Sequence, residues 1–205
     1  MPIRAFSPFV YRDILQMDTC EAISPLAQCV GMRMIVGYAL EHERQKNMPD
    51  SPSEILADLI REENILVDLP SEEHSAVIKA MVQNMVSTEL VAKSNTSTVS
   101  RLLNEREALG STAIGGGVAI PHARIGFSEE PLMAFALLKD GLGFNSLDGA
   151  SVHFVFMVLT PKDDDEIHRD VLKAITFFAK KPIHLKALSG CKTPADVKSV
   201  FQDYA

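Results

Sequence analysis

Residues 109–124 read LGSTAIGGGVAIPHAR, in which four glycines and one proline precede His122. Glycine reaches positive φ cheaply and has no side chain to hold a ligand away. A run of glycines therefore leaves backbone N–H groups able to turn toward an anion. The apolar residues 118–120 predict a short strand, and Pro121 fixes the backbone immediately before the histidine. We therefore expect His122 at a strand end, beside anion-binding amides of three consecutive glycines, Gly115, Gly116 and Gly117.

The familiar glycine motifs do not match this stretch. From Gly115, the pattern G-x-G-x-x-G needs glycine at position 120, where isoleucine stands, and no G-K-[ST] follows. Dinucleotide and P-loop sites are therefore disfavoured. A neutral imidazole nitrogen is a nucleophile near physiological pH, and surrounding donors would suit an anionic group bound to it. The combination points to a phosphohistidine.

The run from Arg106 to His122 follows R-E-x-L-G-S-T-x-x-G-x-G-x-A-I-P-H. It resembles the signature of type-2 enzyme IIA domains (fructose, mannitol and nitrogen-regulatory branches) of the bacterial phosphoenolpyruvate-dependent phosphotransferase system. The similarity continues through FNSLDG at 144–149, LTP at 159–161 and the histidine at 168. Together with the alternation of expected helices and strands, it implies an α/β fold with a mixed sheet of about five strands and helices on both faces.

The resemblance implies a phosphocarrier. His122 would accept a phosphoryl group from the histidine-containing phosphocarrier protein and pass it to a cysteine of a IIB domain for sugar uptake. Arg106 would clamp the phosphate, because a guanidinium matches phosphate oxygens in a planar fork. His168, in the first turn of an expected helix, would stay neutral and donate a hydrogen bond to the phosphoryl group. Without the resemblance, Arg106 extending to water and His168 on the surface are the ordinary interpretations.

Several alternatives stay open. Ala123-Arg124 follows the histidine where many relatives have glycine, which crowds that side and adds positive charge near the phosphate. No IIB or IIC portion follows, which favours a free-standing soluble component. A regulatory role, in which the phosphorylation state chooses protein partners as in the nitrogen-regulatory branch, is the alternative function. A zinc hydrolase that uses His122 and His168 lacks a third ligand cluster. We expect no nucleotide, metal or other cofactor.

Composition narrows the class further. With 46% hydrophobic and 23% charged residues, the chain is an ordinary globular protein. Its net charge of −7 argues against nucleic acid or an anionic membrane as the main partner. Three cysteines without a C-x-x-C motif indicate a reducing, cytoplasmic compartment. No apolar run approaches the ~18 residues of a membrane span, so no membrane insertion is expected.

The chain divides into an N-terminal extension, residues 1–50, and a phosphocarrier domain, residues 51–205. The extension is a packed segment, a mobile arm or an over-extended start, and the sequence does not decide among these. Met81 and Met85 continue a helical stripe and are expected in the core rather than at a metal. His153 is expected to be packed or at an edge. Three histidines in polar surroundings are expected to be solvated surface groups: His42, His74 and His184. Expected helices cover 53–61, 71–90, 96–109, 166–180, 182–188 and 194–203, and expected strands cover 65–69, 131–139 and 152–160.

Overall fold

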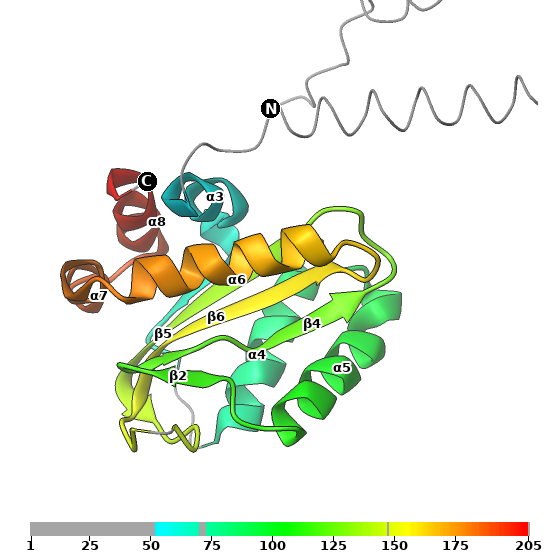
Figure 1. Cartoon of the computed structure of the whole chain (residues 1–205), viewed down its shortest axis with the longest axis horizontal. Helices are drawn as coiled ribbons and strands as arrows, with labels where there is room; N and C mark the ends of the chain where they lie inside the picture. The colour runs from blue at the N-terminus through cyan, green and yellow to red at the C-terminus, as the bar shows by residue number, and fades with distance from the viewer. Residues whose placement is uncertain (1–51, 70–72, 147, 205) are drawn as a thin grey trace, which may run out of the picture. The chain divides into compact units, whose positions relative to one another are not determined.

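A six-stranded mixed sheet forms the centre of the computed structural model, which describes residues 52–69, 73–146 and 148–204 (Figure 1). The strand order is β1-β5-β6-β3-β2, with β4 also paired to β6. The strands are β1 (Ile65–Val67), β2 (Ala113–Gly115), β3 (Val118–Ala119), β4 (His122–Ile125), β5 (Leu132–Leu142) and β6 (Val152–Pro161). β5 and β6 run antiparallel, whereas β1, β3 and β4 each pair in parallel with their central neighbour.

The stretch around His122 forms three short strands, which is why the sheet exceeds the predicted count of about five. β3 and β4 follow one another along the same edge of β6. They are separated by Ile120 and by Pro121, which has no N–H to give to the ladder. The carbonyl of Pro121 nevertheless accepts a hydrogen bond of 2.9 Å from the amide of Val158, so the chain stays against β6 as it reaches His122.

The central strand β6 is covered on both faces. All of its residues except His153 are buried, as the nearly continuous apolar sequence predicts. His153 is half-buried and its Nδ1 lies 3.0 Å from the carbonyl oxygen of Leu138, so the predicted packed position is confirmed. Phe135 of β5 stands opposite Phe156 of β6 and their rings meet edge to face.

Helices cover both faces of the sheet, as predicted. α4 (His74–Ser87) and α5 (Thr96–Ala108) lie on one face (Figure 1). The other carries α3 (Pro52–Leu59), α6 (Asp165–Ala179), α7 (Pro182–Ser189) and α8 (Pro194–Asp203). Met81 and Met85 are buried in the core under α4, where the sequence placed them. The predicted start of α4 at Ser71 falls outside the described residues, and the first helical residue is His74.

The N-terminus of α6 is set by local chemistry. Asp164 is the N-cap, and its carboxylate accepts a 2.9 Å hydrogen bond from the amide of Ile167. Asp165 and Glu166 occupy the first turn, where negative charge complements the helix dipole. This cap fixes where α6 begins and so places His168 in its first turn.

His184 is not a solvated surface group, and that prediction is wrong. Its side chain is 3% exposed and lies between the rings of Phe178 and Tyr204, each 4.4 Å away between centroids. Its Nδ1 lies 3.1 Å from the carbonyl oxygen of Phe178. Burial lowers the pKa of His184, with the Lys181 charge adding to the effect. His74 is half-buried against Phe144, and His42 lies outside the described residues.

The described residues belong to one compact unit that spans Pro49–Ala205. The predicted extension at residues 1–50 lies outside them. In the described part of the chain, no helix is both long and apolar enough to cross a membrane.

Candidate functional site

His122 opens β4 and is half-buried, in register with Val158 of β6. Its Nδ1 lies 2.7 Å from the carbonyl oxygen of Ile120. A carbonyl only accepts hydrogen bonds, so this contact assigns the ring proton to Nδ1. The lone pair of the neutral ring is then at Nε2, which faces away from the backbone.

Arg106 approaches that lone pair from the last turn of α5. Its Nε donates a 3.1 Å hydrogen bond to Nε2 of His122. A second donor, Nη1, reaches the carbonyl oxygen of Gly110 at 3.0 Å and so ties the guanidinium to the end of its own helix. The guanidinium stays charged at any physiological pH, so a permanent positive charge borders the imidazole.

The surroundings of His122 keep it neutral. Burial is the largest influence and lowers its pKa below the ordinary value of 6.5, and the charges of Arg106 and Arg124 lower it further. The Ile120 carbonyl and the Glu107 carboxylate act in the opposite direction but do not reverse the shift. The imidazole is therefore uncharged and nucleophilic at neutral pH.

His168 stands beside His122, with ring centroids 5.6 Å apart and planes inclined by 55°. The Nδ1 atom of His168 lies 2.8 Å from the hydroxyl oxygen of Thr160, a fully buried residue near the end of β6. Burial lowers the pKa of His168, followed by the positive charge of Arg124. The structure thus brings together the three residues that the sequence singled out for the chemistry: Arg106, His122 and His168.

Arg124 adds a second cation to this site. It lies two residues after His122 on β4, so the alternation of side chains places both on the same side of the strand. Its Nη1 donates to the carboxylate of Asp165, and more weakly to the carbonyl oxygen of Lys162 at 3.4 Å. The Arg124 guanidinium also lowers the pKa of the Asp165 carboxyl.

Polar side chains of the signature fasten the loop between α5 and β2. The Glu107 carboxylate accepts hydrogen bonds from the backbone amide of Thr112, at 3.2 and 3.3 Å, and from its hydroxyl at 2.6 Å. The hydroxyl of Ser111 donates to the carbonyl oxygen of Phe144. These bonds fix the loop that follows α5 and so the end of the helix that carries Arg106. Sequence reasoning assigned no role to Glu107, Thr112 or Thr160, although all three stand in the quoted motifs.

The three consecutive glycines do not lie at the imidazole. Gly115 ends β2, and Gly116 and Gly117 form the turn to β3; their φ values of 89°, 62° and 78° favour glycine. The carbonyl of Gly117 accepts hydrogen bonds from the amides of His153 and Phe154 at the start of β6. His122 pairs instead with Val158. Val158 lies four residues beyond Phe154 on β6, which separates the two pairing positions by about 13 Å. The amide of Gly116 donates to the Asp148 carboxylate at 2.9 Å. The geometry therefore separates Gly115, Gly116 and Gly117 from the predicted phosphate site.

A family model described as "Phosphoenolpyruvate-dependent sugar phosphotransferase system, EIIA 2" matches residues 58–204. The chain belongs to this family. This EIIA 2 protein is 36% identical over 110 residues to a nitrogen regulatory protein of Pseudomonas aeruginosa, covering 54% of this chain and 70% of the relative. It is 34% identical over 146 residues to a nitrogen regulatory protein of Bradyrhizobium diazoefficiens, covering 71% of this chain and 94% of that relative.

A sugar-specific relative also matches. The fructose-specific EIIABC component of Bacillus subtilis is 31% identical over 121 residues, covering 59% of this chain and 19% of that protein. Among solved structures, the nitrogen regulatory protein IIA-Ntr of Neisseria meningitidis superposes with a TM-score of 0.65 at 22% identity, covering 72% of this chain and 99% of that one. IIA mannitol of Escherichia coli superposes with a TM-score of 0.58 at 16% identity, covering 69% of this chain and 98% of that one. These structures support the fold of the EIIA 2 protein.

Within the described residues of this EIIA 2 protein, no group of three or more His, Cys, Asp or Glu side chains is arranged to hold a metal ion. The described cysteine, Cys191, is a free thiol.

Proposed function

We propose that His122 carries the phosphoryl group of this phosphocarrier on Nε2. The observation that supports this most strongly is the pair of contacts on the ring. Ile120 accepts at Nδ1, 2.7 Å away, and the Arg106 guanidinium lies 3.1 Å from Nε2. Nδ1 therefore carries the proton, and the nucleophilic Nε2 faces the Arg106 guanidinium, a group that binds phosphate oxygens.

The transfer step follows from this arrangement. The Nε2 lone pair attacks the phosphorus of the phosphohistidine on the donor, the histidine-containing phosphocarrier protein. A new N–P bond forms as the donor's N–P bond breaks, and the donor's ring, which carries a proton on its other nitrogen, leaves with the electron pair as a neutral imidazole. Nδ1 retains its proton throughout, so the step needs no general base. The Ile120 carbonyl stabilises the positive charge that the phosphorylated ring then carries.

Three side chains would stabilise the phosphoryl group. Arg106 must release Nε2 and turn its donors to the phosphoryl oxygens, which a planar guanidinium binds in pairs. If the Thr160 hydroxyl donates to Nδ1 of His168, the remaining ring proton is at Nε2, from which His168 can donate. Arg124 supplies further positive charge and can exchange its exposed partner Asp165 for the phosphoryl oxygens.

We propose that residues 51–205 form the phosphocarrier domain and that its role is regulatory, with the phosphorylation state of His122 controlling binding to a protein partner. The support is the similarity to nitrogen regulatory proteins at 34–36% identity, over 70% and 94% of their lengths. Adding about two negative charges to a site bordered by Arg106 and Arg124 changes the surface that a partner meets. The cysteine pattern supports a cytoplasmic location.

Phosphorylation can be tested directly. The chain is incubated with phosphoenolpyruvate and the general phosphotransferase proteins, and the product is weighed by mass spectrometry. We expect one acid-labile phosphoryl group on the wild type and on His74→Ala, and none on His122→Ala. An adduct that persists unchanged in His122→Ala would place the phosphoryl group elsewhere.

Delivery to sugar uptake is the second candidate, supported by the match to the Bacillus subtilis fructose component. In that case a IIB cysteine thiolate attacks the phosphorus, and an S–P bond forms as the N–P bond to His122 breaks. Mixing the phosphorylated chain with sugar-specific IIB proteins separates the two roles. Transfer to a IIB cysteine supports sugar delivery, whereas failure of transfer together with phosphorylation-dependent binding to another protein supports regulation.

A further inference from the structure

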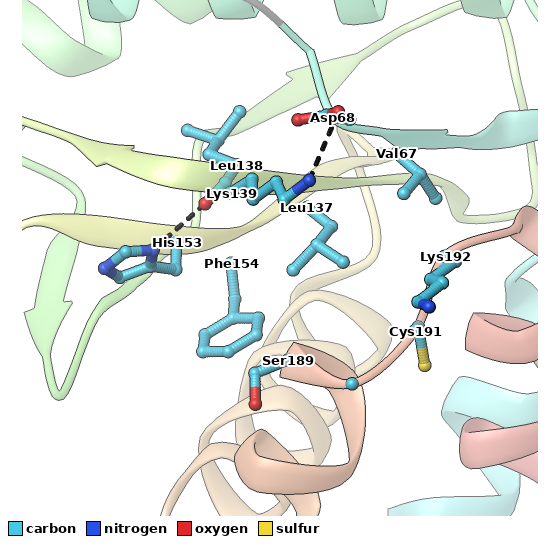
Figure 2. Close-up of a pocket in the computed structure, with 11 residues that line it drawn as sticks. Val67, Asp68, Leu137, Leu138, Lys139, His153, Phe154, Ser189, Cys191 and Lys192 are labelled. Carbon is cyan, nitrogen blue, oxygen red and sulfur yellow. Dashed lines mark hydrogen bonds and ion pairs between the residues drawn. The ribbon is translucent and has the colours of Figure 1, made fainter.

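A second cavity lies far along β6 from His122. It has a volume of about 360 Å³ and is bordered by the end of β1, the middle of β5, the start of β6 and the segment that joins α7 to α8 (Figure 2). Its β6 residues are His153 and Phe154, whereas His122 is in register with Val158. The volume is at the lower end of the ~300–1,000 Å³ range of small-molecule sites.

The floor of this cavity is an apolar row across three strands. Val67 of β1 is in register with Leu137 of β5, which is in register with Phe154 of β6. Residues in register on neighbouring strands point to the same face of a sheet, so these side chains form one continuous surface. The α7–α8 segment lines the cavity with four residues, Ser189, Gly190, Cys191 and Lys192. Burial raises the pKa of the Cys191 thiol, so this thiol is uncharged at neutral pH.

Charged side chains line the cavity. The hydrogen bond from the Lys192 amide lowers the pKa of the neighbouring Asp196 carboxyl, and the nearby charge of Lys192 lowers it further. Lys139 and Lys192 line the cavity together with a single carboxylate, that of Asp68 (Figure 2). The Nζ atom of Lys139 lies 3.9 Å from Asp68, and the two side chains are 76% and 63% exposed. Such an exposed pair is weak, so an incoming anion can replace Asp68 at little cost.

The position of Asp68 is set by its backbone. Its φ of 58° is left-handed, and its amide donates a 3.0 Å hydrogen bond to the carbonyl of Leu137. Aspartate tolerates this conformation better than most residues. The carboxylate is therefore held at the end of β1, where it orients Lys139 without covering the apolar row.

We propose that this cavity binds a small organic monocarboxylate with an aromatic or branched aliphatic body. The body would rest on Val67, Leu137 and Phe154, and the carboxylate would meet Lys139 and Lys192. Neither contact alone would give selective binding. The apolar row cannot recognise a carboxylate, and an ion pair with an exposed lysine is weak.

Amide proton–nitrogen correlation spectra of the full chain test this with three probes. Phenylacetate has both a ring and a carboxylate, phenylacetamide has the ring without the charge, and acetate has the charge without the ring. We expect saturable shifts with phenylacetate at the amides of Lys139, Phe154 and Cys191. Both control probes should bind at least about fivefold more weakly.

Variants locate the contacts. Lys192→Gln should weaken phenylacetate binding about two- to fivefold, and Val67→Phe, which fills the cavity, should abolish it. Lys186→Gln, which removes an exposed lysine of α7 outside the lining, should leave the affinity unchanged. The proposal is overturned by equal affinity for phenylacetamide, by shifts centred on His122, by unchanged affinity in Lys192→Gln, or by no saturation at about 10 mM.

Discussion

The Nε atom of Arg106 lies 3.1 Å from Nε2 of His122 and donates its proton to the nitrogen that we assign as the phosphoryl acceptor. The same arginine is tied to the carbonyl of Gly110, and the neighbouring Glu107 anchors the loop that follows. The positive charge is therefore beside Nε2 before any phosphate arrives, and the guanidinium needs only to turn its donors from Nε2 to the phosphoryl oxygens. Such preorganised charge is the largest contribution that a protein makes to many transfer reactions.

Replacing Arg106 tests this contribution. Arg106→Gln removes the positive charge beside Nε2, and we expect phosphorylation of His122 to slow by about 100-fold. Arg101→Gln is the matched control, since Arg101 lies on the same helix and is paired with Glu105 in an exposed salt bridge. Rapid-quench measurement with phosphorylated carrier protein gives both rates. Equal rates in the two variants would contradict the role of Arg106.

The Thr160 hydroxyl is expected to orient His168. Thr160→Val keeps the shape of the fully buried side chain but removes the 2.8 Å contact to Nδ1. The ring then loses its fixed orientation, so the phosphohistidine should transfer about two- to tenfold more slowly, as the loss of one hydrogen bond predicts. In the background of His168→Ala, the same substitution should have no further effect on transfer. An undiminished effect there would show that Thr160 acts by another route.

Arg124 should influence His168 more than His122. Its charge is the second largest cause that lowers the pKa of His168 but the smallest of the causes given for His122. Arg124→Gln should therefore raise the pKa of both rings, and that of His168 by more. Titration of the ring protons by NMR measures both shifts, with Lys173→Gln, a distant exposed lysine of α6, as control. A larger rise at His122 would contradict the arrangement.

Acid should destabilise the fold through three histidines, His122, His168 and His184. Each has a native pKa below the ordinary value of 6.5, chiefly because of burial. The unfolded chain therefore binds more protons as the pH falls through 6.5, and the free energy of unfolding decreases. The melting temperature should be lower at about pH 5.5 than at about pH 7.5.

His184→Phe separates one part of this effect. It keeps a ring between Phe178 and Tyr204 but removes the titrating group, so the melting temperature should depend less steeply on pH. A wild-type melting temperature that rises on acidification, or an equally steep dependence in the variant, would contradict the assignment.

The fold and the reacting side chains could be predicted from the sequence for different reasons. The nearly continuous apolar runs of β5 and β6 and the cap at Asp164 are local signals, and the structure follows them. The meeting of Arg106, His122 and His168 joins three separate elements. It was expected only because the motif around His122 resembles a known signature.

The predicted positions of the three glycines and of His184 were wrong for one physical reason: contacts with residues distant in sequence decide where these residues lie. The glycines precede His122 by only five to seven positions, but extended chain covers about 3.3 Å per residue, so they reach the other end of β6. His184 lies between Lys181 and Lys186 in the sequence, yet it contacts Phe178 and Tyr204 from adjoining elements. Its position four residues before the buried Leu188, and thus on the same face of α7, was the available signal.

The site of attachment on the ring tests the central claim most directly. After phosphorylation of nitrogen-labelled protein, long-range proton–nitrogen NMR of His122 identifies which ring nitrogen carries phosphorus. Because Ile120 holds the proton on Nδ1 at 2.7 Å, we predict a phosphoryl group on Nε2 and a protonated Nδ1. A phosphoryl group on Nδ1 would contradict the account, because it would require the Ile120 contact to break and would turn the phosphate away from Arg106.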